Sequence, residues 1–329
     1  MRGVAIAATG MYLPARVVTN EDLIAEGGLP VSARWIERHT GIRERRWAAE
    51  GEFTSDLAAA AARDVLARAG VDAADLDRLI LATISPDWPT PATAVVVQHA
   101  IGARCPAFDV SSACAGFMVA LDLGVRCVQT GENAVLALAA EIRSRWIDKT
   151  DPRVAPLFSD GAAGALLVPA PAGTGFLATV LQADGSGAEK VLVPAGGSRK
   201  PASAETVAAG EHFIRMVDGR AIFEQAVVGM GAIAALALEK AGLSLGDVDL
   251  VIPHQPNKLI VEAAKKAMGV PLDRVVMTVD RLGNCTAATV PLALHEAVVS
   301  GRLRPGQTAL LLAVGGGYSA GAAVYKVPG

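Results

Sequence analysis

The residue best suited to chemistry is a cysteine, Cys114, at the predicted start of a helix. It follows a strand-like stretch, 108–110, and a turn of small residues, 111–113, and it opens an apolar helix that ends near Gly131. Free backbone N–H groups and the positive end of the helix dipole stabilise a thiolate at such a position. We therefore expect the pKa of Cys114 to fall from about 8.5 toward neutrality, as a nucleophile for thioesters requires.

A histidine, His254, is the second candidate. It ends the predicted strand 248–253, and a helix predicted to run through Met268 begins just after Asn257. Ligands of α/β proteins bind at the carboxyl ends of strands, so His254 is expected to face a site. Packing or a surface position explains the other histidines better: His39, His99, His212 and His295.

Two further groups could hold an oxygen atom of a substrate. Asn284 lies in a glycine turn, although asparagine is common in such turns for structural reasons. The glycines 315–317 follow the apolar strand 309–314, and they let the backbone approach a ligand and offer N–H groups to an oxyanion. The other cysteines have no CxxC or metal-ligand spacing and indicate buried thiols in a reducing cytoplasm: Cys105, Cys127 and Cys285.

An internal repeat divides these groups between two halves of the chain. Segments 69–83 and 241–252 share an Ala-Gly turn, two aspartates and an apolar strand, and the register continues so that Cys114 falls opposite Cys285. Asn284 then falls opposite Ala113, beside the nucleophile. We expect halves of 1–170 and 171–329, each alternating helix and strand, which implies an α/β fold of two packed sheets with helices around and between them.

Composition narrows the class of protein. The chain has 329 residues, of which 52% are hydrophobic, 19% charged and 4% aromatic, which favours a large core built from small side chains. A net charge of −3 gives no electrostatic support for nucleic-acid binding. The first residues contain a short apolar stretch that Thr9 and Gly10 interrupt, so we expect a first strand and neither a signal peptide nor a membrane span.

Over essentially its whole length the chain resembles the β-ketoacyl-[acyl carrier protein] synthase III family of the thiolase superfamily. Six segments carry the resemblance: WIERHTGIRERR (35–46), CPAFDVSSACAGF (105–117), FSDGAAGALL (158–167), IPHQPN (252–257), RLGNCTAATVP (281–291) and AVGGGYSAG (313–321). The resemblance implies a duplicated thiolase-like fold in five αβαβα layers, and a homodimer.

The resemblance also implies a reaction sequence. Cys114, His254 and Asn284 correspond to the catalytic triad of the family, and the backbone N–H groups of Cys114 and Gly316 to its oxyanion hole. An acyl-CoA would acylate Cys114, and decarboxylative condensation with malonyl-[acyl carrier protein] would give a β-ketoacyl product. No metal or redox cofactor is expected. The second catalytic Cys of a thiolase, the two His of other ketosynthases and the acidic base of a hydroxymethylglutaryl-CoA synthase are missing from this pattern.

The same resemblance assigns binding residues. Those expected to contact substrate are Trp35, Arg153, Asn257, Thr90, Phe223 and Gly219, with Trp35 stacking on the CoA adenine. Those expected to dock the acidic carrier protein are Lys258, Lys265, Lys266 and Arg274.

The chain departs from the family at four positions. His39 replaces an arginine before Thr-Gly-Ile, and Leu259 replaces an arginine of the docking surface. Thr90 and Val314 replace aromatic residues that close the acyl tunnel in some relatives, so smaller walls predict an acyl primer longer or bulkier than acetyl.

Two other functions remain open from the residues. One keeps acyl-Cys114 but transfers the acyl group to an alcohol or amine without decarboxylation, as the altered docking residues suggest. The other is a non-catalytic partner of a ketosynthase, against which the retained Cys114 argues.

Overall fold

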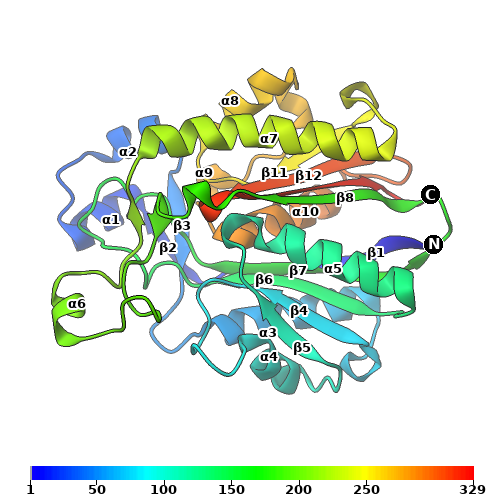
Figure 1. Ribbon diagram of the computed structural model, residues 1–329, viewed down its shortest axis with the longest axis horizontal. Coiled ribbons are helices and arrows are strands. Elements are labelled where there is room, and N and C mark those ends of the chain that lie inside the picture. Colours follow the sequence, from blue (N-terminus) through cyan, green and yellow to red (C-terminus); the bar gives the residue numbers. More distant parts are fainter. Residues whose placement is uncertain (1) are drawn as a thin grey trace.

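Within residues 2–329, the main sheet contains nine strands in the order β11-β12-β13-β8-β1-β7-β6-β4-β5. The structure is a computed structural model that describes residues 2–329 (Figure 1). The nine strands are β1 (Gly3–Tyr12), β4 (Arg78–Ala82), β5 (Ala107–Val110), β6 (Val135–Glu141), β7 (Gly161–Ala170), β8 (Gly175–Ala183), β11 (Leu250–Pro253), β12 (Thr308–Gly315) and β13 (Ser319–Lys326). Apolar runs bounded by glycine or proline form these strands, as the sequence predicts.

The sheet consists of two parts with the same topology. In one, β4 and β6 run parallel while β7 and β1 follow antiparallel; in the other, β11 and β12 run parallel while β13 and β8 follow antiparallel. One parallel pair, Val4 with Gly175, joins the parts between β1 and β8. This single pair links the two parts by hydrogen bonds, and the parts form the two β layers that the sequence predicts. The halves 1–170 and 171–329 remain a proposal.

Helices lie on both outer sides and between the two parts of the sheet (Figure 1). α3 and α4 cover the first part, α7 and α8 cover the second, and α5 and α10 contact strands of both. These helices are α3 (Thr54–Ala69), α4 (Thr93–Ile101), α5 (Gly116–Thr130), α7 (Gly219–Ala241), α8 (Lys258–Met268) and α10 (Thr289–Val299). The arrangement gives the five layers αβαβα that the resemblance implies.

The central layer holds the largest hydrophobic core, in which α5 and α10 pack between the strands. Small side chains such as Ala120 and Ala293 line this layer and are fully buried, which allows the helices to approach the strands closely. Each part of the sheet has a further core beneath its outer helices, one under α3 and α4 and the other under α7 and α8. The low aromatic content of the sequence is thus explained by tight layering.

The segment 113–130 and α7 are apolar and long enough to cross a membrane by composition. Both pack on the sheet: α5 lies in the central layer, and α7 covers β8, β12 and β13. Core helices commonly pass this compositional test, so it is weak support for a membrane span.

Smaller elements form a cap at one end of the sheet (Figure 1). A separate hydrophobic core holds part of the cap together, with Val18, Ile36 and Trp47 almost fully buried. The elements outside the main layers are β2 (Arg16–Thr19), α1 (Asn20–Gly27), α2 (Ala33–Thr40), β3 (Glu44–Trp47), β9 (Val191–Leu192), α6 (Ala204–Ala208), β10 (Arg215–Met216) and α9 (Val279–Leu282).

The structure corrects the register of the repeat at the nucleophile. A 3-10 turn, Ala113–Ala115, precedes α5, and an equivalent turn, Thr286–Ala288, precedes α10. Each turn begins with a residue at positive φ, 44° at Ala113 and 52° at Thr286. Ala113 therefore corresponds to Thr286, and the predicted pairing of Cys114 with Cys285 is wrong by two residues.

Candidate active site

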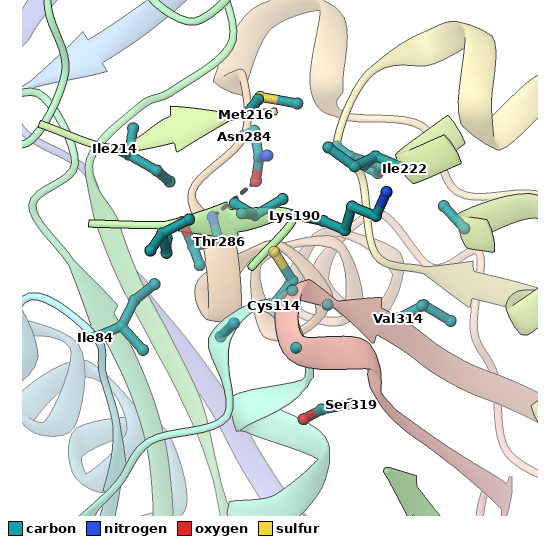
Figure 2. A pocket seen from close by; sticks show the side chains of 18 of the residues that line it. Ile84, Cys114, Lys190, Ile214, Met216, Ile222, Asn284, Thr286, Val314 and Ser319 are labelled. Atoms are coloured by element: carbon teal, nitrogen blue, oxygen red, sulfur yellow. Dashed lines mark hydrogen bonds between the residues drawn. The ribbon is translucent and has the colours of Figure 1, made fainter. Parts of the chain in front are cut away.

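A cavity of about 510 Å³ lies where the two parts of the sheet and the cap meet. Cys114, His254 and Asn284 all line it, although they lie far apart in the sequence. Its other walls are mostly apolar, and Figure 2 shows Ile84, Ile214, Met216, Ile222 and Val314 around Cys114. Such a cavity suits a hydrocarbon chain that ends at the sulfur atom.

The backbone around Cys114 is strained and tightly packed. Of residues 2–329, the non-glycine residues at positive φ are Ala113, Thr286 and Tyr318, and all three line the cavity. Such strain persists only where the surroundings hold it in place, and it gathers at functional sites. A Cβ atom at Gly315 would lie 2.8 Å from the backbone nitrogen of Cys114, so only glycine allows this approach.

Burial, assisted by the Glu141 carboxylate, raises the pKa of the Cys114 thiol to about 12. Arg143 and the backbone N–H groups of Cys114 and Gly316 act in the opposite direction. The position just before α5 is as predicted, but the predicted fall in pKa is wrong, because burial outweighs the helix terminus. The thiol thus requires a proton acceptor when it attacks.

His254 follows directly after β11 and is 1% exposed. Burial lowers its pKa to about 3, so the imidazole is neutral at physiological pH. Nδ1 lies 2.6 Å from Oγ1 of Thr289, whose hydroxyl donates to the Thr286 carbonyl at 3.0 Å. Because this hydroxyl has a single proton, Nδ1 donates to it and Nε2 carries the lone pair. Nε2 is buried without a hydrogen-bond partner among residues 2–329, so it can accept a proton.

Asn284 is 4% exposed, and its backbone pairs with the segment around Phe158. Its side-chain Oδ1 accepts a hydrogen bond from the backbone N–H of Thr286 at 2.9 Å (Figure 2). This contact fixes the orientation of the amide and leaves the Nδ2 donor for a ligand. A donor at this position can stabilise negative charge on a substrate oxygen.

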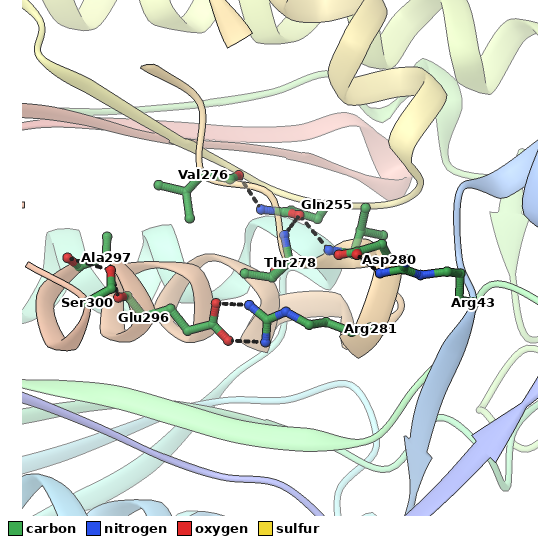
Figure 3. A network of polar contacts seen from close by, with 10 residues as sticks. Arg43, Gln255, Val276, Thr278, Asp280, Arg281, Glu296, Ala297 and Ser300 are labelled. Atoms are coloured by element: carbon green, nitrogen blue, oxygen red, sulfur yellow. Dashed lines mark hydrogen bonds and ion pairs between the residues drawn. The ribbon is translucent and has the colours of Figure 1, made fainter. Parts of the chain in front are cut away.

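A buried glutamine joins the segments that carry His254 and Asn284. Gln255 donates from Nε2 to the Val276 carbonyl at 2.7 Å and accepts at Oε1 from the backbone N–H groups of Thr278 and Val279 at 2.8 and 3.0 Å (Figure 3). The end of β11 is therefore fixed to the start of α9, which leads to Asn284.

The predicted substrate-binding residues divide into two groups. Asn257 lines the cavity, where its side chain also caps α8 by accepting from Ile260 N–H at 2.8 Å. Trp35, which is partly exposed on α2, stacks on His39 at a ring distance of 4.2 Å. Of the six predicted residues, only Asn257 lines the cavity. The five that do not line it are Trp35, Arg153, Thr90, Phe223 and Gly219.

The predicted docking residues follow α8. Lys258 begins the helix close to the cavity, Lys265 and Lys266 lie in its last turn, and Arg274 is exposed in the 3-10 turn that follows. Some basic residues nearby are already neutralised, since Arg43 pairs with Asp280 at 2.6 Å (Figure 3). Leu259, which replaces the arginine of the family, is 39% exposed beside Lys258.

Three residues near the site were missed by the sequence analysis. Thr289 fixes the orientation of His254, and Glu141 is buried at the end of β6 with its pKa raised to about 7 by burial. Arg143 is 1% exposed and lines the cavity. The strand-end rule that selected His254 also applies to Glu141 and Arg143, because both lie at the carboxyl end of an apolar strand.

The fold defines a class: a duplicated α/β protein of the thiolase type, with cysteine, histidine and asparagine in one cavity. Residues 108–185 match the description "3-Oxoacyl-[acyl-carrier-protein (ACP)] synthase III", and residues 238–327 match its C-terminal counterpart. The chain is 47% identical over 324 residues to the β-ketoacyl-[acyl-carrier-protein] synthase III of Roseiflexus castenholzii, covering 98% of this chain and 97% of that protein. It therefore belongs to the 3-oxoacyl-[acyl-carrier-protein] synthase III family.

Solved structures agree with this assignment. The β-ketoacyl-[acyl carrier protein] synthase III of Thermus thermophilus superposes with a TM-score of 0.89 at 40% identity, covering 98% of each chain. The priming β-ketosynthase of the R1128 polyketide pathway superposes with a TM-score of 0.90 at 33% identity, covering 99% of this chain and 97% of that one. The protein is an acyl-transferring condensing enzyme, and a purely non-catalytic role is set aside.

Proposed function

We propose that Cys114 carries the acyl group of this condensing enzyme, and that the acyl-enzyme then condenses with a malonyl group held by an acyl carrier protein. The observation that carries the proposal is the common cavity, in which the thiol, an unpaired His254 Nε2 and the Asn284 amide donor meet. The names of the relatives and of the polyketide-priming neighbour support a role in starting fatty-acid or polyketide chains.

In the first half-reaction, Cys114 Sγ attacks the thioester carbon of an acyl-CoA. The thiol proton passes to His254 Nε2 as the bond forms, because neither group is ionised beforehand. The N–H groups of Cys114 and Gly316 stabilise the oxyanion, which is supported by their effect on the sulfur. The proton then leaves with CoA as its thiol.

In the second half-reaction, the malonyl thioester loses CO₂ and forms an enolate. The neutral imidazole of His254 acts here in its Nε2–H tautomer, in which Nδ1 accepts from the Thr289 hydroxyl. His254 Nε2 and Asn284 Nδ2 then both donate to the enolate oxygen. The enolate carbon attacks the acyl carbon, the bond between Cys114 sulfur and that carbon breaks, and its electron pair stays on the sulfur. The sulfur then takes up one proton from solvent, which restores the thiol. Both donors that this step requires, His254 and Asn284, line the cavity.

The proposal extends to the partners of the enzyme and to its location in the cell. Trp35, Arg153, Asn257, Phe223 and Gly219 would bind the substrate, and a partner copy would bring Thr90 to the tunnel in a homodimer. The basic side chains on and after α8 support docking of an acidic carrier protein beside the cavity: Lys258, Lys265, Lys266 and Arg274. We place the enzyme in the cytoplasm, with neither nucleic acid nor membrane as a partner.

The proposal is tested by incubating the protein with an acyl-CoA and malonyl-carrier protein, and identifying the carrier-bound product by mass spectrometry. A β-ketoacyl-carrier protein with release of one CO₂ per product is expected. Transfer of the unchanged acyl group to an added alcohol or amine, without CO₂ release, would show the alternative acyltransferase instead.

Replacing Asn284 with alanine or aspartate is expected to separate the two half-reactions. Alanine donates no hydrogen bond, and aspartate places an acceptor where the enolate needs a donor. The rate of condensation should therefore fall by about 10²–10³-fold. Acylation of Cys114 should remain close to that of the wild type, and it serves as the internal control for folding. Equal loss of both half-reactions would show that Asn284 positions the nucleophile rather than the enolate.

A further inference from the structure

A buried arginine whose side chain has no hydrogen-bond partner among residues 2–329 lies in the wall of the catalytic cavity. Arg143 follows the end of β6 by two residues and is 1% exposed. Its Nε and Nη1 atoms are buried and have no hydrogen-bond partner among residues 2–329. Its charge acts on the Cys114 thiol, which lines the same cavity. Arg143 and the proposed acyl position on Cys114 therefore share one cavity.

A second buried arginine shows what a structural role looks like in this protein. Arg45 is fully buried, and its terminal nitrogens donate to the Val18 carbonyl at 3.2 Å, to Asn20 Oδ1 at 2.7 Å and to the Pro156 carbonyl at 3.0 Å. Arg143 Nη1 has no such acceptor. Its guanidinium lies instead over the rings of Trp146 and Phe158, at 5.8 and 5.6 Å from their centres. Ring contacts hold its faces and leave the donors at its edge for a ligand.

The acidic groups near Arg143 are committed to other partners. Glu141 accepts from the Ser85 hydroxyl at 2.6 Å and from the Ile84 N–H at 3.2 Å. Asp160 accepts from the backbone N–H groups of Arg143 and Ser144 and from the Ser144 hydroxyl, so it fixes the backbone and not the guanidinium. No ion pair to Arg143 forms within residues 2–329. A buried guanidinium without a contacting anion is costly unless a ligand supplies one.

Resting on the proposed acyl-Cys114, we propose that Arg143 binds a carboxylate at the far end of the acyl group. The donor is then the CoA monothioester of a dicarboxylic acid. The planar edge of a guanidinium matches a carboxylate with two parallel hydrogen bonds. The carboxylate of the malonyl extender is a poorer fit, because an ion pair that stabilises it before CO₂ loss would slow decarboxylation.

The chemistry of acylation is unchanged by this contact. Cys114 sulfur bonds to the thioester carbon, the bond from that carbon to the CoA sulfur breaks, and the thiol proton leaves on CoA by way of His254. The distal carboxylate stays intact on Arg143. The contact therefore selects the donor and takes no part in bond making.

The experiment uses matched donors: succinyl-, glutaryl- and adipyl-CoA, each beside the iso-branched acyl-CoA in which an isopropyl end replaces the carboxylate. Each pair has the same shape and differs in charge. The rate of acyl-enzyme formation, followed by intact-protein mass spectrometry, gives kcat/KM for each donor. The wild type should prefer at least one carboxyacyl donor over its isostere by about 100-fold or more.

Arg143→Leu should reverse this preference, while Arg143→Lys should keep part of it. Acylation of Arg143→Leu by the iso-branched donors reports that the variant is folded, and the wild-type panel decides the question if it is not. Faster acylation of the wild type by every iso-branched donor would overturn the role of Arg143 and leave acyl-Cys114 standing. Acylation by no donor would refute the acyl-Cys114 proposal itself.

Discussion

Replacing Cys114 with alanine is expected to abolish the covalent acyl-enzyme and to lower the rate of condensation by at least about 10⁴-fold. The thiol is the proposed nucleophile, and among residues 2–329 no other cysteine lines the cavity. Intact-protein mass spectrometry after incubation with acyl-CoA measures this directly. The wild type should gain the mass of one acyl group, and the variant none.

Cys285→Ala and Cys127→Ala are the matched controls for this experiment. Cys285 is fully buried, its thiol lies 3.5 Å from the Leu282 carbonyl, and burial raises its pKa to about 12 as well. Cys127 is half-buried within α5, the helix that Cys114 precedes. Both variants should still gain one acyl group. Labelling of Cys114→Ala equal to that of the wild type would place the acyl group on another side chain.

Most of the fold could be predicted because its elements are bounded by residues with strong local preferences. Gly131, at a φ of 140°, ends α5, and Asn257 caps α8 with its side chain, as the motifs indicated. Pro253 ends β11, so His254 follows the strand directly. These signals lie within a few residues of the feature that they set.

What could not be predicted depends on contacts between distant segments. In the structure, the strained backbone at Ala113 and Thr286 defines the register of the repeat. The sequence analysis matched residue types and therefore aligned Cys114 with Cys285. The pKa of Cys114 depends on how deeply the cavity buries the sulfur, and the sequence showed only the helix start. From the sequence, Arg143 is an ordinary charged residue after a strand. Only the structure shows that its Nε and Nη1 atoms are buried without a hydrogen-bond partner among residues 2–329.

Replacing His254 with alanine is expected to slow acylation by about 10³-fold near pH 7 and to make it strongly dependent on pH. The wild-type pair is neutral over a wide range, because the pKa of His254 is lowered to about 3 and that of Cys114 is raised to about 12. Neither group titrates between pH 6 and 9, so this pair should make no contribution to a pH dependence of the wild-type acylation rate in that range.

Without His254, the thiol must lose its proton to solvent. Because its pKa is raised to about 12, the thiolate fraction grows tenfold for each unit of pH below that value. The acylation rate of His254→Ala should therefore rise tenfold per pH unit between pH 7 and 9. Single-turnover acylation at several pH values, with folding checked by circular dichroism, measures both the loss and the slope.

His295→Ala provides the matched control, because His295 is also buried and also forms a hydrogen bond with a threonine side chain. Its Nδ1 lies 3.0 Å from Oγ1 of Thr9, burial lowers its pKa, and it does not line the cavity. Losing it should cost stability and leave the pH profile of acylation flat. If His254→Ala gave the same flat profile, the proton of Cys114 would have another acceptor, and Glu141, whose pKa burial raises to about 7, would be the next group to replace.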